Sequence, residues 1–117
     1  DGFPRHVLGP LILTLDDSCE FDEVMFGVIS CIESFPRAAY FEELLAILPL
    51  LKKKSPRWCG ILHTRIMNSN DNFSDYLELA STPGLSRDAF VEVLREIESD
   101  PRFEERCRRA IQRVQGS

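Results

Sequence analysis

The sequence predicts an all-α fold of about seven short helices in stacked antiparallel pairs. Apolar residues recur at spacings of three and four, and no segment shows the sustained alternation of a β-strand. Proline and glycine divide these apolar segments from one another. With 44% hydrophobic and 28% charged residues, the composition is that of an ordinary globular protein. The 117 residues suffice for one domain, residues 1–117, and leave no room for a second.

The first two helices are predicted over residues 4–15 and 23–34. Gly9-Pro10 interrupts the first segment, so a short or kinked helix is expected there. Asp22 is the predicted N-cap of the second helix. That helix carries a wide apolar stripe, which predicts a central position in the fold. The members of the stripe are Val24, Met25, Phe26, Val28, Ile29, Cys31 and Ile32.

The third helix is predicted over residues 37–48, with Pro36 in a favourable position at its start. Its apolar stripe is built from tyrosine, phenylalanine and leucine. Pro49 is expected to end this helix, or to leave a short kinked extension to Leu51. The three lysines at 52–54 are then expected to form a solvated turn.

The fourth and fifth helices are predicted over residues 56–68 and from residue 70 or 71 to residue 80. Ser55-Pro56 combines a favourable N-cap with a proline in the first turn of the fourth helix. The fourth helix has a regular apolar stripe that begins at Trp58. The fifth helix has two aromatic residues on its apolar face.

The last two helices are predicted over residues 87–98 and 102–114. Thr82-Pro83-Gly84 is the clearest loop signal in the chain, and Ser86 is the predicted cap of the sixth helix. Asp100-Pro101 repeats the combination of cap and proline ahead of the seventh. Short helices with short connections predict a HEAT-like solenoid, but no fixed repeat length is visible, so an irregular bundle is the structural alternative.

The chain lacks the patterns of a catalytic, metal or cofactor site. It has no glycine-rich phosphate loop, and its four cysteines and two histidines do not have metal-binding spacing. Cys31, Cys59 and Cys107 fall on apolar faces of predicted helices, which favours buried, reduced thiols in a cytoplasmic protein. Cys59 and His63 share a helix face, so a thiol-dependent hydrolase or lyase is the last-ranked alternative. A hydrogen-bonded, partly buried His63 is favoured over it.

No apolar run approaches the roughly 20 residues that span a bilayer, so no membrane segment is expected. Nothing in the first residues resembles a signal peptide. The chain begins with Asp1 instead of methionine, which leaves room for a natural N-terminus further upstream. The basic runs lack interleaved aromatic residues, so nucleic-acid binding is not expected.

Charge is distributed unevenly along the chain. Residues 1–51 contain nine acidic residues and two arginines, a net charge of −7, whereas residues 52–117 have a net charge of +2. An acidic half suits a basic protein partner and repels nucleic acid. A purely solubilising role for these acids is the alternative.

One group on the fourth helix combines a large aromatic side chain, a guanidinium and an amide near the helix end. These residues are Trp58, Arg65 and Asn68, and their predicted role is structural. Arg65 is predicted to pair with Glu33 of the second helix and so to fix how the two helices pack. Direct contact with a partner is the alternative.

Several of these segments together resemble a known protein family. The resemblance runs through residues 23–26, Ile32-Glu33, Leu48-Pro49, Pro56-Arg57-Trp58 and residues 65–69. It is a resemblance to the small all-helical immunity proteins of bacterial contact-dependent growth inhibition and polymorphic toxin systems. Such proteins are non-enzymatic inhibitors without cofactors that bind the C-terminal toxin domain of their cognate effector in the cytoplasm.

The resemblance implies a toxin partner, often a nuclease with a basic surface, and the acidic front half of the chain suits such a partner. The predicted partner-binding residues are Asp16, Asp17, Glu20, Glu33, Glu42 and Glu43. The rival hypothesis is a generic helical-repeat adaptor or scaffold protein.

Overall fold

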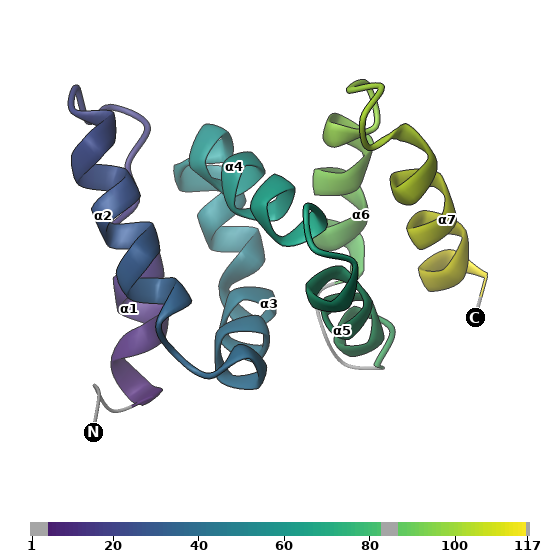
Figure 1. Cartoon of the computed structure of the whole chain (residues 1–117), viewed down its shortest axis with the longest axis horizontal. Helices are drawn as coiled ribbons and strands as arrows, with labels where there is room; N and C mark the ends of the chain where they lie inside the picture. The colour runs from purple at the N-terminus through teal and green to yellow at the C-terminus, as the bar shows by residue number, and fades with distance from the viewer. Residues whose placement is uncertain (1–4, 83–86, 117) are drawn as a thin grey trace.

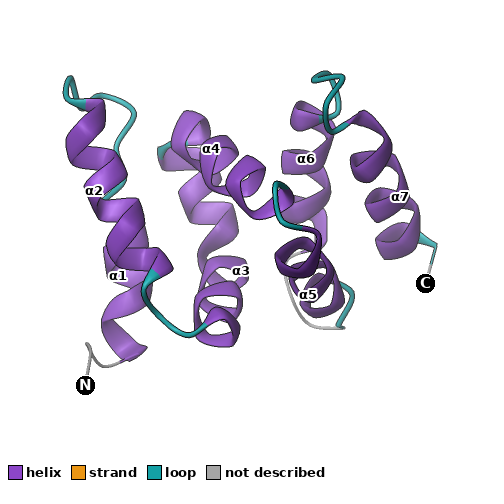
Figure 2. Cartoon of the chain, viewed as in Figure 1, coloured by secondary structure: helices purple, strands orange, loops and turns teal. Residues whose placement is uncertain are grey.

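The computed structural model describes residues 5–82 and 87–116, which form helices and no strand (Figures 1 and 2). A 3₁₀ helix, η1, covers Arg5–Val7. The seven α-helices are α1 (Leu8–Ile12), α2 (Asp22–Glu33), α3 (Arg37–Lys54), α4 (Pro56–Met67), α5 (Asn70–Ala80), α6 (Arg87–Ile97) and α7 (Glu104–Gln115). The predicted all-α fold is confirmed. The predicted cap Ser86 and most of the loop before it lie outside the described residues.

Helix α3 is the centre of the arrangement, with α1 and α2 at one end and α6 and α7 at the other (Figure 1), so the predicted central position of α2 is wrong. It contacts α1, α2, α4, α5 and α6. In a solenoid each repeat touches only its neighbours, so these contacts are more typical of an irregular bundle. The radius of gyration of 13.6 Å agrees with the compact value of about 13 Å expected for a chain of this size.

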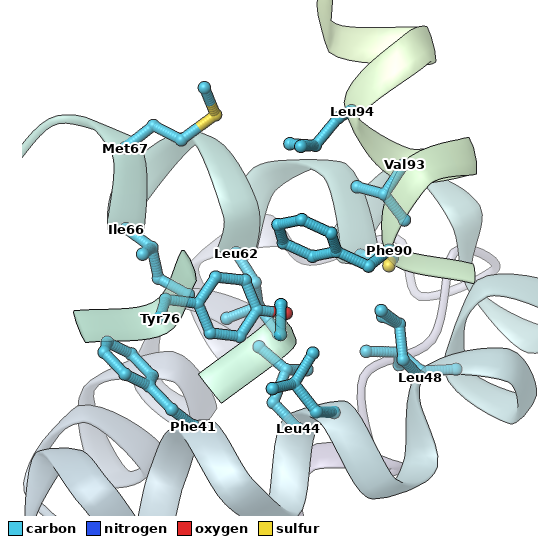
Figure 3. Packing of buried hydrophobic residues seen from close by; sticks show 14 of the residues in the cluster. Phe41, Leu44, Leu48, Leu62, Ile66, Met67, Tyr76, Phe90, Val93 and Leu94 are labelled. Atoms are coloured by element: carbon cyan, nitrogen blue, oxygen red, sulfur yellow. The ribbon is translucent and has the colours of Figure 1, made fainter. Parts of the chain in front are cut away.

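The core is one continuous cluster of buried apolar side chains that joins all seven α-helices. Figure 3 shows the part of it where residues of α3, α4, α5 and α6 meet. There Tyr76 of α5 packs between Phe41 of α3 and Phe90 of α6. Its ring centroid lies 5.1 Å from that of Phe41 and 5.5 Å from that of Phe90. Aromatic contacts of this kind add to the free energy of apolar burial.

The prediction for Pro49 is wrong, because α3 continues through it to Lys54. Leu48 and Leu51 are both fully buried, so the turn that contains Pro49 is stabilised by the core. The expected lysine turn is instead the last turn of α3, where cations are favoured by the helix dipole. Lys52 also pairs with Glu96 of α6, at 3.0 Å.

Two predicted helix starts are also corrected. Asp22 is the first residue of α2 and not its cap, which is Phe21. Helix α7 begins at Glu104, two residues later than predicted, because Asp100 accepts a hydrogen bond from the backbone N–H of Arg102 and holds a turn there. The remaining starts and ends differ from prediction by at most one residue where they are described, apart from α1, which is shorter than predicted and is preceded by η1.

Candidate interaction surface

The side chains of α2 point in three directions. Met25, Ile29 and Ile32 are buried and form the core side of the helix. A second side faces α4 through one aromatic and two charged contacts. The third side, turned away from α4, carries apolar residues that remain exposed.

The side of α2 that faces α4 has an ion pair near each end. Arg57 donates to the Asp22 carboxylate at 3.0 Å, and this hydrogen bond lowers the pKa of Asp22. At the other end, Arg65 donates two hydrogen bonds of 2.8 Å to Glu33, one to each carboxylate oxygen. The predicted pairing of Glu33 with Arg65 is therefore formed. Such a two-point geometry is directional, and the role of fixing how α2 packs against α4 stays a prediction.

Trp58 lies between these two ion pairs and is fully buried. The Phe26 ring of α2 packs edge-on against it, with centroids 5.2 Å apart, and the Arg57 guanidinium lies 4.8 Å from its ring centroid. Its indole N–H is buried without a hydrogen-bond partner among the described residues. These contacts make Trp58 an anchor of the fold and remove it from the surface. Asn68, the third residue of this predicted group, is the exposed C-cap of α4.

Asp17, a predicted partner-binding residue, makes hydrogen bonds inside the chain. Its two carboxylate oxygens accept from the backbone N–H groups of Arg57, at 2.9 Å, and Trp58, at 3.1 Å. These are unpaired donors of the first turn of α4, so Asp17 caps a helix that begins about 40 positions later. The expected cap residue, Ser55, is buried and instead donates to the carbonyl oxygen of Leu15.

The other predicted partner-binding acids are not gathered in one place. Asp16 holds the loop after α1 by accepting from the N–H and hydroxyl of Ser18. Glu20 is exposed in the same loop, whereas Glu33 lies at the far end of α2. Glu42 and Glu43 are half-buried on α3. A methyl group at Gly9 of α1 would stand 3.4 Å from the Glu43 carboxylate, so that carboxylate lies against α1.

Most arginines near the C-terminus have partners within the chain. Arg108 pairs with Glu98 and Glu104, and Arg109 pairs with Glu105. Arg106 donates to the carbonyl oxygen of Met67 at the end of α4. The basic region therefore has much of its charge compensated locally.

The buried pair Cys59 and His63 is not arranged for nucleophilic chemistry. The His63 Nδ1 atom lies 2.7 Å from the carbonyl oxygen of Cys59, and Nε2 lies 2.7 Å from the hydroxyl of Tyr76. Burial lowers the pKa of His63 to about 4 and raises the pKa of the Cys59 thiol to about 12. A neutral imidazole with both nitrogens engaged beside a protonated thiol supplies neither a base nor a nucleophile.

The exposed apolar side of α2 was not predicted. Val24 and Phe26, expected in a buried stripe, are 53% and 42% exposed, and Cys31, expected to be buried, is exposed. Cys59 and Cys107 are buried as predicted. The width of the stripe was the available signal, because seven apolar positions extend around more of a helix than its neighbours can cover.

No three His, Cys, Asp or Glu side chains in the described part of the chain lie close enough together to hold a metal ion. Among the same residues, no helix is long and apolar enough to cross a membrane.

The comparison with protein families gives a match in the N-terminal part of the chain. The family model described as Immunity protein 30 matches residues 4–76, which include α1 to α4 and most of α5. Neither the curated proteins nor the solved structures gave a match. The family match covers more than half of the chain and agrees with the resemblance found in the sequence. The chain belongs to the Immunity protein 30 family, the immunity proteins of polymorphic toxin systems.

Proposed function

We propose that this chain neutralises a cognate nuclease toxin by direct contact between its acidic N-terminal half and a basic surface of the toxin's C-terminal domain. The proposal places the complex in the bacterial cytoplasm, as part of a contact-dependent growth inhibition system. Neither nucleic acid nor a membrane takes part in the inhibition.

The observation that carries this proposal is the charge of the N-terminal half of the chain, nearly all of which lies within the part that the family model matches. Residues 1–51 have a net charge of −7. A nuclease must bind phosphate groups and therefore has a basic substrate surface. Opposite charges accelerate the encounter of two proteins and favour the correct partner.

The acids at 16, 17, 20, 33, 42 and 43 are proposed to supply this field, although their direct roles differ. Asp17 caps α4 and Glu33 pairs with Arg65, so neither is available as a free contact residue, and the charge of Glu33 is compensated locally. Glu20 is exposed and makes no ion pair with any residue that the structure describes, so it is the member best suited to direct contact.

Co-expression tests the proposal. The toxin domain encoded beside this gene should arrest growth of cells that lack this chain and should not arrest cells that produce it. The wild-type chain should reduce DNA or RNA cleavage by the purified toxin domain in proportion to complex formed. Continued growth arrest despite normal amounts of folded chain would contradict the proposal.

Charge reversal tests the surface separately from the fold. Glu20→Lys should slow association by about 10-fold or less at low salt, and added salt should reduce the difference. Arg109→Glu is the control, because Arg109 is exposed on α7 and, within the described part of the chain, its ion pair is with Glu105 one turn earlier on the same helix. A larger loss from Arg109→Glu than from Glu20→Lys would place the contact on the last helices instead.

A further inference from the structure

The third side of α2 carries a continuous exposed row that we call the α2 stripe: Phe21, Val24, Gly27, Val28 and Cys31. Spacings of three and four place these positions along one side of the helix. Phe21 is 59% and Val24 is 53% exposed, Val28 is half-buried, and the Cys31 thiol is exposed. Exposed apolar residues that are contiguous on one element mark interaction sites more often than scattered ones do.

The described fold leaves most of this stripe exposed. Helix α2 lies at one end of the molecule (Figure 1), with Met25, Ile29 and Ile32 on its buried side and the ion pairs of Asp22 and Glu33 on the side that faces α4. The stripe residues lie on the opposite flank from Phe26, whose ring packs on Trp58. The stripe is thus an exposed apolar surface at Phe21 and Val24, and its member Val28 packs in part against the core.

Gly27 leaves room for a partner on this side of α2. It lies in the middle of α2, where glycine is less favourable than alanine. A methyl group at this position would meet nothing within 4 Å, so packing inside the chain does not require glycine. A glycine on an exposed helix side does allow another backbone to approach closely.

The charges beside the stripe indicate the chemistry of that partner. Glu20 and Glu23 are exposed at its N-terminal end, and neither has a recorded ion pair among the described residues. Asp22 and Glu33, on the α4 side, are compensated by Arg57 and Arg65. A complementary surface therefore has apolar side chains next to lysine or arginine.

A second copy of this chain does not offer that complement. No lysine or arginine occurs between residues 6 and 36, so the α2 of another copy would bring no cation to Glu20 and Glu23. The charge pattern therefore favours a basic protein over a homodimer.

We infer that the α2 stripe is the surface on which the toxin domain docks, with apolar toxin residues on Val24 and Gly27 and toxin cations on Glu20 and Glu23. This inference rests on the proposed function and names the surface that performs it. The probe for every test is the purified toxin domain encoded beside this gene.

The first test uses a matched pair of substitutions. Val24→Lys should weaken toxin binding by about 30-fold, the loss typical of a central interface residue. Leu50→Lys is the control, since Leu50 is a comparably exposed apolar residue, at 55%, on α3. The control should bind within about 3-fold of wild type, the range of near-neutral interface changes. Equal losses in the two variants, or none in Val24→Lys, would overturn the inference and leave the proposed function standing.

Gly27→Gln gives an independent test, because it adds a side chain and removes none. The open space at Gly27 and the higher helix propensity of glutamine predict a raised melting temperature. The same side chain should obstruct the partner and weaken binding by at least about 10-fold. A stabilised variant that still binds as wild type would contradict close approach of the toxin at this point.

The rate at which the exposed Cys31 thiol is alkylated measures whether the α2 stripe is covered, without a substitution in the stripe itself. In a Cys19→Ser background, alkylation should occur at Cys31, since Cys59 and Cys107 are buried. Bound toxin domain should slow this alkylation by about 10-fold or more if the stripe is covered. An unchanged rate in a saturated complex would overturn the inference. A concentration-dependent dimer of the free chain that Val24→Lys abolishes would assign the stripe to a second copy. Absence of any complex with the wild-type chain would overturn this inference and the proposed function together.

Discussion

Replacing Asp17 with alanine should destabilise the folded chain by about 2 kcal/mol without involving the toxin. The carboxylate accepts two backbone hydrogen bonds, at 2.9 and 3.1 Å, from the first turn of α4. Loss of a helix cap costs about 1 kcal/mol, and hydrogen bonds to a charged group are worth about 1.5 to 3 kcal/mol. Because Asp17 and the Trp58 amide are partly buried, water replaces these bonds only in part.

For a chain of this length, about 2 kcal/mol corresponds to a fall in melting temperature of roughly 8 °C. Thermal unfolding followed by circular dichroism at 222 nm measures this shift. Asp16→Ala is the matched control, because the hydrogen bonds of that carboxylate to described residues stay within the exposed loop, at Ser18. It should lower the melting temperature by no more than about 2 °C, as expected for a surface substitution. If Asp17→Ala melts with the wild type, the capping role is wrong and Asp17 returns to the candidate contact residues.

Three further predictions concern the core and its attachments. Trp58→Ala should lower the free energy of unfolding in urea by about 3–5 kcal/mol, because the indole is fully buried. A variant whose melting temperature lies within about a degree of that of the wild type would refute this prediction. A double-mutant cycle on Glu33 and Arg65 should give a coupling above about 0.5 kcal/mol, the range for a partly exposed two-point ion pair, whereas additive effects would contradict the predicted latch between α2 and α4. For His63, burial lowers the pKa from 6.5 to about 4. As the pH falls, the imidazole is therefore protonated in the unfolded chain at a higher pH than in the folded chain. Stability contributed by neutral His63 is therefore present above pH 6.5 and lost towards pH 4, by at most about 3 kcal/mol. An imidazole NMR signal for His63 that titrates near pH 6.5 in the folded protein would show this to be wrong.

Local patterns were sufficient to predict the helices and one long-range contact. Periodicity and the Pro and Ser signals placed α4 and α5 to within a residue, because the information for a helix end lies within a few positions of it. The pairing of Glu33 with Arg65 was predictable because each was the prominent charge near the end of an otherwise apolar helix. Its two-point geometry was not.

The errors arose where distant parts of the chain decide the outcome. Helix α3 passes through Pro49 because burial of Leu48 and Leu51 outweighs the local cost of proline. Asp17 caps a helix about 40 positions away, and no local motif encodes such a contact. The exposure of Val24 and Cys31 depends on which side of α2 the rest of the fold covers, and hydrophobicity alone does not distinguish a core side from an interface.

Calorimetric titration of the purified toxin domain into this chain is the most direct test of neutralisation by contact between the two proteins. We expect a one-to-one complex with a dissociation constant in the nanomolar range, a binding free energy of about −12 kcal/mol, as suits an inhibitor that must act at low concentration. The toxin should lose its cleavage activity at the same equivalence point. Absence of binding at about 10 µM of both folded proteins, about −7 kcal/mol or weaker, would contradict neutralisation by direct contact.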